Sequence, residues 1–100
     1  MAVAVSFWKL NPKIRPEEIA KTAAKIMEKG MYPPEGTEIL AWYLCPGGEG
    51  VTITESKTID PAETFRNWMT WVEDKDLFEY YRIYPAISAA DAIQMALRKK

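Results

Sequence analysis

The predicted β-strands of this chain carry large apolar side chains on both of their faces. In residues 2–9, Val5 and Phe7 point to one side and Trp8 to the other, and residues 37–45 also carry large residues on either side. A sheet built from such strands must be covered on both faces, because water on either face would contact apolar surface. This requirement limits the chain to folds in which a second layer lies on each side of the sheet.

Prolines, glycines and helix-capping residues divide the chain into elements. Pro16 suits the first turn of a helix, and Gly30 suits the position just after its end. Asp60 and Pro61 together form a typical helix start. The segment 46–50, Pro-Gly-Gly-Glu-Gly, supplies the reversal of a β-hairpin. The predicted elements are a strand at 2–9, a helix at 16–29, strands at 37–45 and 51–56, a helix at 61–72, a strand at 78–84 and a helix that begins after Ser88.

This order, β-α-β-β-α-β with an extra C-terminal helix, predicts an α+β protein with the ferredoxin-like fold and a four-stranded antiparallel sheet. A length of 100 residues without linker or repeat indicates one ferredoxin-like domain over residues 1–100. Because two helices cover only one face of the sheet, the other face needs the third helix or a second copy of the chain. We favour a homodimer in which two sheets meet face to face, since apolar side chains left in water would forgo several kcal/mol.

Apolar residues at spacings of three and four predict which face of each helix is buried. The predicted stripes are Ile19, Ala23, Ile26 and Met27 in the first helix, Phe65, Trp68, Met69 and Val72 in the second, and Ala89, Ala92, Ile93, Ala96 and Leu97 in the third. Trp68 is therefore expected in the core. Successive residues of a helix are about 100° apart around its axis, and Trp71 therefore lies off the centre of the second stripe, beside Asn67 and Thr64. This position makes Trp71 the better candidate for a pocket wall.

Charge and composition argue against several classes of function. The chain has 13 Lys and Arg against 14 Asp and Glu, a net charge of −1, so nothing draws it as a whole to nucleic acid or to an anionic membrane. The absence of His excludes Ser-His-Asp and Cys-His catalysis, and the single Cys45 is expected to be a small half-buried strand residue. We expect no metal and no cofactor. Without a signal peptide or a long apolar stretch, a cytoplasmic location is predicted.

The same order of elements also occurs in RNA-recognition domains. Those domains need aromatic and basic residues on the third strand, whereas residues 50–55 read Gly-Val-Thr-Ile-Thr-Glu. The basic terminus at 98–100 is typical of a solvated tail at a helix end. No nucleic-acid partner is therefore expected.

Tryptophans and two isolated charges are the candidates for a ligand-binding site. Trp8, Trp42 and Trp71 are predicted to wall a cavity for a flat apolar ligand, although tryptophans of a small domain are also ordinary core residues. Glu55 and Arg82 are single charges on otherwise apolar strands. They either reach solvent at strand ends or point into a dry space, where they would pair or hold a polar group of the ligand.

Several short motifs resemble a known family. They are Phe7-Trp8-Lys9-Leu10, Pro33-Pro34-Glu35-Gly36 and Gly47-Gly48-Glu49-Gly50, together with Trp42, Trp68 and Trp71. Over nearly the whole chain they resemble the domain-of-unknown-function family numbered 3303. The resemblance implies a fold similar to the dimeric α+β barrels, but no assigned reaction and no catalytic residues.

Two functions stay open at this point. The first is a non-enzymatic homodimer that binds a small apolar or aromatic molecule in a cleft. The second is a cofactor-independent enzyme, similar to the small monooxygenases and isomerases of the same barrel class, with Glu55 or Arg82 beside Tyr81 as its polar groups. Both need a cavity beside the tryptophans.

Overall fold

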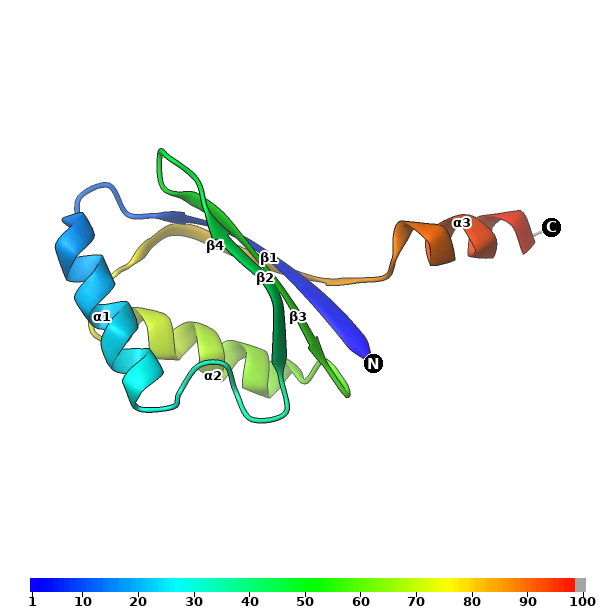
Figure 1. Cartoon of the computed structure of the whole chain (residues 1–100), viewed down its shortest axis with the longest axis horizontal. Coiled ribbons are helices and arrows are strands. Elements are labelled where there is room, and N and C mark those ends of the chain that lie inside the picture. The colour runs from blue at the N-terminus through cyan, green and yellow to red at the C-terminus, as the bar shows by residue number, and fades with distance from the viewer. Residues whose placement is uncertain (99–100) are drawn as a thin grey trace.

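A computed structural model describes residues 1–98. A four-stranded sheet carries two helices on one face, and a third helix projects on the side of the other face (Figure 1). The ferredoxin-like order and the extra C-terminal helix are confirmed. None of the described helices is long and apolar enough to cross a membrane. The elements are β1 (Ala2–Leu10), α1 (Pro16–Glu28), β2 (Glu38–Leu44), β3 (Glu49–Ser56), α2 (Pro61–Val72), β4 (Phe78–Ala86) and α3 (Ala89–Arg98).

The strands are antiparallel and lie in the order β2-β3-β1-β4, so β1 and β3 form the centre of the sheet. The hairpin of β2 and β3 has one irregularity, because the pairing shifts between Ile39 and Ala41. As a result Ile39 and Trp42 are opposite Thr54 and Thr52, and both face the helices. A regular strand would have sent these two side chains to opposite faces.

The two faces of the sheet are covered unequally. Ala4, Ser6 and Trp8 face α1 and α2 and are buried, whereas Phe7 points to the opposite face and is 47% exposed. We name this opposite side the open face. Cross-strand pairing assigns to it Val3, Val5, Phe7 and Lys9 of β1, Ala41 and Tyr43 of β2, Glu49, Val51, Ile53 and Glu55 of β3, and Tyr80, Arg82, Tyr84 and Ala86 of β4.

Local capping confirms the predicted helix ends. The Asp60 carboxylate accepts a hydrogen bond from the backbone N–H of Ala62 at 2.9 Å, which caps α2. The Ser88 hydroxyl accepts one from the N–H of Asp91 at 3.0 Å, which caps α3. Gly30 follows α1 with φ of 69°, a left-handed conformation that glycine adopts without strain. Of the basic terminus, Arg98 is exposed, and residues 99–100 lie outside the described residues.

The structure corrects the predicted buried face of α2. Phe65 and Met69 are 59% and 48% exposed, whereas Trp71 is only 8% exposed. Thr64, Asn67 and Trp71 instead face the sheet, at the spacing of one helix face. The reason is that the sheet surface beneath the start of α2 is itself polar, while Trp71 gains aromatic contacts with neighbouring side chains. The apolar stripe of α2 therefore lies on the outside of the domain.

Three smaller expectations are also wrong. The predicted buried face of α3 is exposed, because no other element covers it in the single chain. Cys45 is exposed and follows β2, because the turn of the hairpin already begins there, with the N–H of Cys45 bonded to the carbonyl of Glu49 at 2.7 Å. Met27 is 48% exposed, because the buried face of α1 is centred on Thr22 and Ile26.

The fully packed core is small. Ile26, Tyr32, Trp71 and Leu77 form one buried cluster, in which Leu77 is only 1% exposed. The cluster joins α1 and α2 to the segments that flank the sheet. It does not fill the whole space between the sheet and α1, and this leaves room for a cavity.

Candidate functional site

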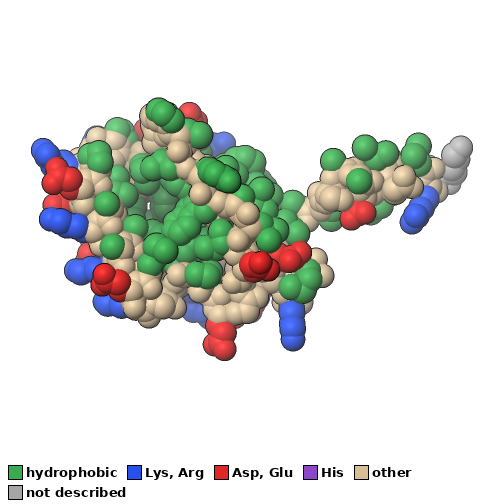
Figure 2. Space-filling model, viewed as in Figure 1, with side chains coloured by type: hydrophobic (Ala, Val, Ile, Leu, Met, Phe, Trp, Pro, Cys, Tyr) green, Lys and Arg blue, Asp and Glu red, His purple; other side chains and the backbone are tan. Residues whose placement is uncertain are grey.

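A cavity of about 520 Å³ lies between the sheet and α1. Figure 2 shows it as a hollow surrounded by hydrophobic side chains. The volume is in the range of small-molecule sites, about 300–1,000 Å³. Its lining includes Trp8, Leu10, Ile14, Ile19, Ala20, Ala23, Tyr32, Trp42, Trp71, Leu77, Phe78 and Tyr81.

Three aromatic rings form one wall of the cavity. Tyr32 meets Trp42 and Trp71 at centroid distances of 5.1 and 5.3 Å, and the two indoles are 6.1 Å apart. All three pairs are edge-to-face, with interplanar angles of 64° to 79°. This is a favourable geometry for aromatic rings, and each ring restrains the other two. The wall is therefore built before any ligand arrives.

Trp8 forms part of the lining contributed by the sheet. Its indole N–H donates to the Thr52 hydroxyl at 2.9 Å, and its ring packs against Phe78 at 5.8 Å. The residue paired with Trp8 on β3 is Gly50. A Cβ at that position would lie 2.6 Å from Cζ3 of Trp8 and still closer to two other ring carbons. Glycine thus allows the indole to lie directly on the neighbouring strand.

A smaller, polar cavity of about 60 Å³ adjoins the large one, with Tyr32 and Tyr81 lining both. The Tyr81 hydroxyl donates to the Ser6 hydroxyl at 3.4 Å. Asn67 also lines this small cavity, and its Oδ1 is buried without a hydrogen-bond partner among residues 1–98. Buried polar atoms are nearly always paired, so an unpaired acceptor marks a place where a water or a ligand donor would bind.

Burial keeps both tyrosines of this region protonated. It raises the pKa of Tyr32 to about 12 and raises that of Tyr81 above its ordinary value of about 10. The adjacent Ser6 and Asn67 side chains oppose the rise at Tyr81. At neutral pH both hydroxyls are therefore neutral groups that can donate a hydrogen bond.

The structure brings the three predicted tryptophans together and separates them from the two predicted charges. Trp8, Trp42 and Trp71 all line the large cavity. Glu55 and Arg82 belong to the open face, and neither lines the large or the small cavity. The Arg82 guanidinium lies 4.9 Å from the centre of the Tyr80 ring. The sheet itself lies between these charges and the tryptophans.

Trp68 is also outside the cavity. It packs on Phe65 at 5.4 Å, toward the outer side of α2, and is half-buried. Trp68 was expected in the core, and this expectation is wrong, because the buried cluster lies on another face of the helix.

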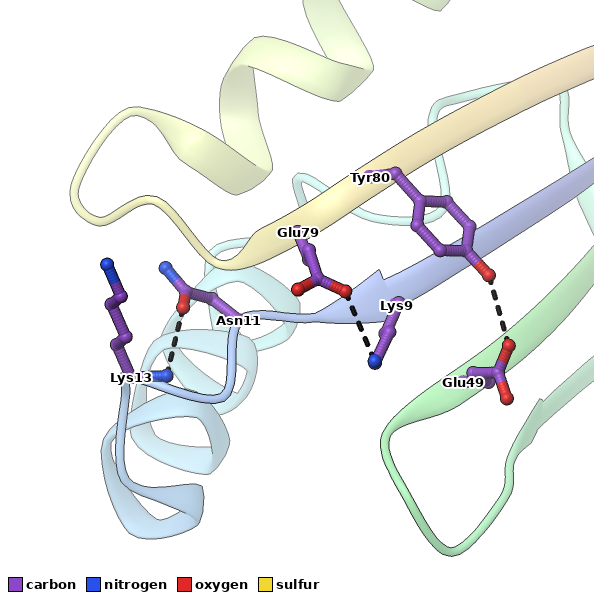
Figure 3. Close-up of polar contacts among 6 residues, drawn as sticks. All are labelled: Lys9, Asn11, Lys13, Glu49, Glu79 and Tyr80. Atoms are coloured by element: carbon purple, nitrogen blue, oxygen red, sulfur yellow. Dashed lines mark hydrogen bonds and ion pairs between the residues drawn. The ribbon is translucent and has the colours of Figure 1, made fainter.

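The charged and polar side chains at one end of the sheet form ion pairs and hydrogen bonds with one another (Figure 3). Lys9 forms an ion pair with Glu79 at 3.2 Å, and its hydrogen bond to that carboxylate raises the lysine pKa. The Tyr80 hydroxyl donates to Glu49 at 3.2 Å. These side chains are exposed or half-exposed, and their charged and polar groups are already paired with one another. We therefore regard them as structural contacts and not as part of a binding site. Among residues 1–98, no three His, Cys, Asp or Glu side chains gather as a metal site would require.

The fold places the chain among known structures. A ferredoxin-like sheet with two helices on one face is also the fold of solved proteins described as antibiotic biosynthesis monooxygenases. The chain belongs to the family described as domain of unknown function (DUF3303), whose model matches residues 7–100. The resemblance noted from the sequence motifs is thereby confirmed. No curated protein matches the chain.

Solved structures similar to this chain share its fold at low sequence identity. A putative antibiotic biosynthesis monooxygenase from Bacteroides thetaiotaomicron has a TM-score of 0.60 and 16% identity, with 88% of this chain and 89% of that chain covered. An uncharacterised NIPSNAP domain protein from Burkholderia xenovorans has a TM-score of 0.58 and 11% identity, with coverage of 90% and 96%. A putative antibiotic biosynthesis monooxygenase from Nitrosomonas europaea has a TM-score of 0.55 and 14% identity, with coverage of 89% and 99%.

Sequence reasoning missed the polar end of the site. Asn67 lies four residues before Trp71, on the same face of α2, so a helix turned toward Trp71 necessarily turns Asn67 inward as well. That spacing was the available signal. Gly50 and Ser6 gave no signal of their own, because their roles depend on the side chains that face them from other strands.

Proposed function

We propose that this protein binds a small, flat, apolar or aromatic molecule in the cavity between the sheet and α1, and that it works as a homodimer. The observation that carries the proposal is the cavity of about 520 Å³ walled by Trp8, Trp42 and Trp71. Aromatic rings held edge-to-face offer preformed faces on which a flat ligand stacks, with little loss of side-chain freedom on binding. The cytoplasmic location expected from the sequence stays a prediction.

The polar end of the site supports a ligand with one or two hydrogen-bonding groups. The unpaired Oδ1 of Asn67 would accept a hydrogen bond, and the oxygen of the Tyr81 hydroxyl, whose proton is donated to Ser6, would accept another. These groups lie beyond the aromatic wall, in the small cavity that shares Tyr32 and Tyr81 with the large one. A flat ring system with a single hydroxyl matches this combination of an apolar body and a polar end.

Energy transfer from tryptophan to an anthracene ring tests the proposal directly. The probe is 9-anthracenemethanol, a flat tricycle with one hydroxyl, and the protein carries Trp68→Phe, which removes the tryptophan outside the cavity. We expect saturable quenching of the remaining tryptophans with matching anthracene emission. Absence of transfer up to the solubility limit of the probe, and with a panel of other flat aromatics, would refute ligand binding at this site.

Two alanines on α1 supply a matched pair of variants. Ala20 lines the cavity, whereas Ala24, one turn later, does not. Ala20→Phe should fill part of the space and weaken probe binding at least about tenfold, while Ala24→Phe should leave it unchanged. Equal effects of the two substitutions would show that the probe binds elsewhere.

The open face supports the homodimer. Among its side chains Phe7, Tyr43 and Tyr84 are 47%, 67% and 50% exposed in the single chain. Phe7 and Tyr84 already pack together at 6.3 Å, so they present one aromatic patch across β1 and the edge strand β4. Exposed apolar patches of this kind are typical of protein interfaces. Sedimentation equilibrium at micromolar concentration should give twice the chain mass of 11.4 kDa, and Phe7→Asp should shift the protein to the monomer.

Cofactor-independent oxygenation is a second candidate function. Two similar folds are described as putative antibiotic biosynthesis monooxygenases, and the half-buried Asn67 and Tyr81 could orient a phenol or enol oxygen. Glu55 and Arg82 are unsuited to this role, since the sheet lies between them and the cavity. Oxygen uptake with anthrone, which needs one O₂ to give anthraquinone and water, tests the idea. A rate above the uncatalysed one that Asn67→Ala abolishes would support it, and a rate equal to buffer alone would exclude anthrone as a substrate.

A further inference from the structure

The open face carries two charges that have no ionic partner in the single chain. Glu55 lies on β3 and Arg82 on β4, and neither forms an ion pair within residues 1–98. Lys9 and Glu49, the other two charged residues of this face, already make polar contacts with side chains of β4. Glu55 and Arg82 are therefore the two charges of this face for which a partner has to be found.

These two residues do not meet within one chain. Arg82 is paired with Phe7 of β1, and Glu55 is paired with Val3 of the same strand. They are thus two strands apart and four residues apart along the strand direction, which places their Cα atoms about 17 Å from each other. The Arg82 guanidinium lies 4.9 Å from the centre of the ring of Tyr80, the next residue of this face in the direction away from Glu55.

A face-to-face dimer would bury both charges. Glu55 and Arg82 lie on opposite sides of Val5, each about 8 Å from it, and Val5 belongs to the central strand β1. A standard interface of about 800 Å² per partner extends roughly 16 Å from its centre. Both residues fall well inside that radius. An unpaired charge is strongly unfavourable there, so each of them needs a partner of opposite sign.

A second carboxylate strengthens the need for a cation beside Glu55. Glu38 of β2 is directly opposite Glu55 in the sheet, ahead of the irregularity of β2, and therefore lies on the same side of the sheet. Like charges at directly opposed positions destabilise a sheet. Neither carboxylate has a Lys or Arg in ion-pair contact in the described part of the chain. This corner of the sheet would be stabilised by a cation from outside the chain.

A two-fold axis through the middle of the open face supplies the missing partners. Rotation by 180° about an axis that lies between the two sheets exchanges positions on opposite sides of that axis. If the axis passes over Val5, at right angles to the line from Glu55 to Arg82, each of these residues comes opposite the other one in the partner. Packed sheets are about 10 Å apart, a gap that extended Arg and Glu side chains together span. The same rotation brings the partner's Lys9 toward Glu38.

Pairing Arg82 with a different carboxylate of this face would centre the dimer poorly. If Arg82 met the partner's Glu49, the axis would pass between Phe7 and Lys9, near one end of the sheet. The apolar residues at the other end, such as Val3, would then stay in water. The axis over Val5 instead covers the apolar residues on both sides of the centre.

We propose that Arg82 of one copy forms an ion pair with Glu55 of the other, twice in each dimer, and that these two pairs fix the register in which the open faces meet. This inference rests on the proposed homodimer, but not on ligand binding in the cavity. An arginine stacked on an aromatic ring still has N–H groups for a carboxylate, so its contact with Tyr80 is compatible with the pair. Any other register would leave charges buried without partners, which disfavours it.

Charge reversal in separate chains tests the pairing. Glu55→Arg and Arg82→Glu each place like charges opposite one another in their own dimers. Each should raise the dimer dissociation constant at least about a hundredfold in sedimentation equilibrium. An equimolar mixture of the two variants should dimerise about as tightly as wild type, because every contact in the mixed dimer again joins opposite charges.

The matched control makes the same two reversals outside the open face. Arg66 on α2 and Glu73 just after it are exposed. Arg66→Glu, Glu73→Arg and their mixture carry the same changes in net charge, and all should leave the dissociation constant unchanged. If wild type sediments as a monomer, the homodimer and the ion pairs are both wrong. If wild type is a dimer and the open-face reversals act no more strongly than the controls, or their mixture stays dissociated, the ion pairs are wrong and the homodimer stands.

Cross-linking without a spacer gives a second readout in an intact dimer. Arg82→Lys keeps the positive charge and supplies an amine, which a carbodiimide joins to a carboxylate in ion-pair contact. In dimers reassembled from unlabelled and ¹⁵N-labelled chains, we expect cross-linked peptides that join residues 82 and 55 and carry one label each. Wild type lacks the amine and should not give this product. Cross-links confined to one chain, or made to carboxylates away from the corner of Glu38 and Glu55, would contradict the pairing.

Discussion

Replacing Gly50 by Ala should displace the indole of Trp8 and so disturb both the fold and the cavity. The two residues are cross-strand partners, and a Cβ on residue 50 would lie 2.6 Å from Cζ3 of Trp8, with two further ring carbons closer. Trp8 is 6% exposed, so its ring has no free path into water. It must tilt away from β3, into the cavity, and the bond from its N–H to the Thr52 hydroxyl at 2.9 Å must break.

The size of the effect follows from these contacts. Overpacking a well-filled site costs about 1–3 kcal/mol, and a lost side-chain hydrogen bond about 1 kcal/mol. Removing a glycine from a strand recovers about 0.5–1 kcal/mol. We therefore expect Gly50→Ala to lower the free energy of unfolding by about 2–3 kcal/mol, a large part of the stability of a small domain.

Urea unfolding followed by far-ultraviolet circular dichroism measures this loss without relying on tryptophan emission. The control is a double-mutant cycle with Trp8→Phe, whose shorter ring lacks the clashing carbons. In a protein that already carries Trp8→Phe, the Gly50→Ala substitution should change stability by less than about 1 kcal/mol. If Gly50→Ala costs the same in both backgrounds, the loss arises from the backbone and the reasoning about the indole is refuted. A weaker affinity for 9-anthracenemethanol should accompany the displaced ring.

Three further predictions concern the helix cap, the buried tyrosine and the hydrogen bond of Trp8. Asp60→Ala should lower the free energy of unfolding by about 1 kcal/mol in the same urea assay, and no change would show that the cap contact is not formed in solution. Tyr32, with a pKa raised to about 12, keeps in the folded state a proton that the unfolded chain loses near pH 10. Its contribution is thus fully present below pH 10 and lost as the pH rises to about 12, so wild type should lose up to about 2 kcal/mol over this interval and Tyr32→Phe should lose less. Equal alkaline losses in the two proteins would contradict the buried phenol. Thr52→Val should cost about 1 kcal/mol, less than Gly50→Ala, because it removes the hydrogen bond of Trp8 without a clash.

Much of the architecture was predictable from the sequence because it depends on local chemistry. Asp60, Gly30 and the hairpin segment 46–50 act through neighbouring backbone groups, so their effect is the same in any fold that contains them. Alternation in residues 2–9 showed that the sheet has two apolar faces and therefore needs cover on both. The order of elements then left the ferredoxin-like arrangement as the simplest solution.

The site was predictable only in part. Three tryptophans were chosen by residue type, and their convergence on one cavity depends on the shift at β2 and on the rotation of α2. The two charges Glu55 and Arg82 were chosen by contrast with their neighbours, which does not reveal the face of the sheet to which a residue points. Strand register decides that point, and it is a property of two strands together.

The sequence alone determined the class of fold, the ends of the helices and the need for a second layer on the open face, since each follows from backbone geometry or from the periodicity of apolar residues. Tertiary structure alone decided that α2 turns Asn67 and Trp71 inward and leaves Phe65 and Met69 outside. The physical reason is that a helix with apolar residues on two sides has no intrinsic preference between them. The surface beneath it makes the choice, and here a polar patch of the sheet and two aromatic rings favour the less apolar side.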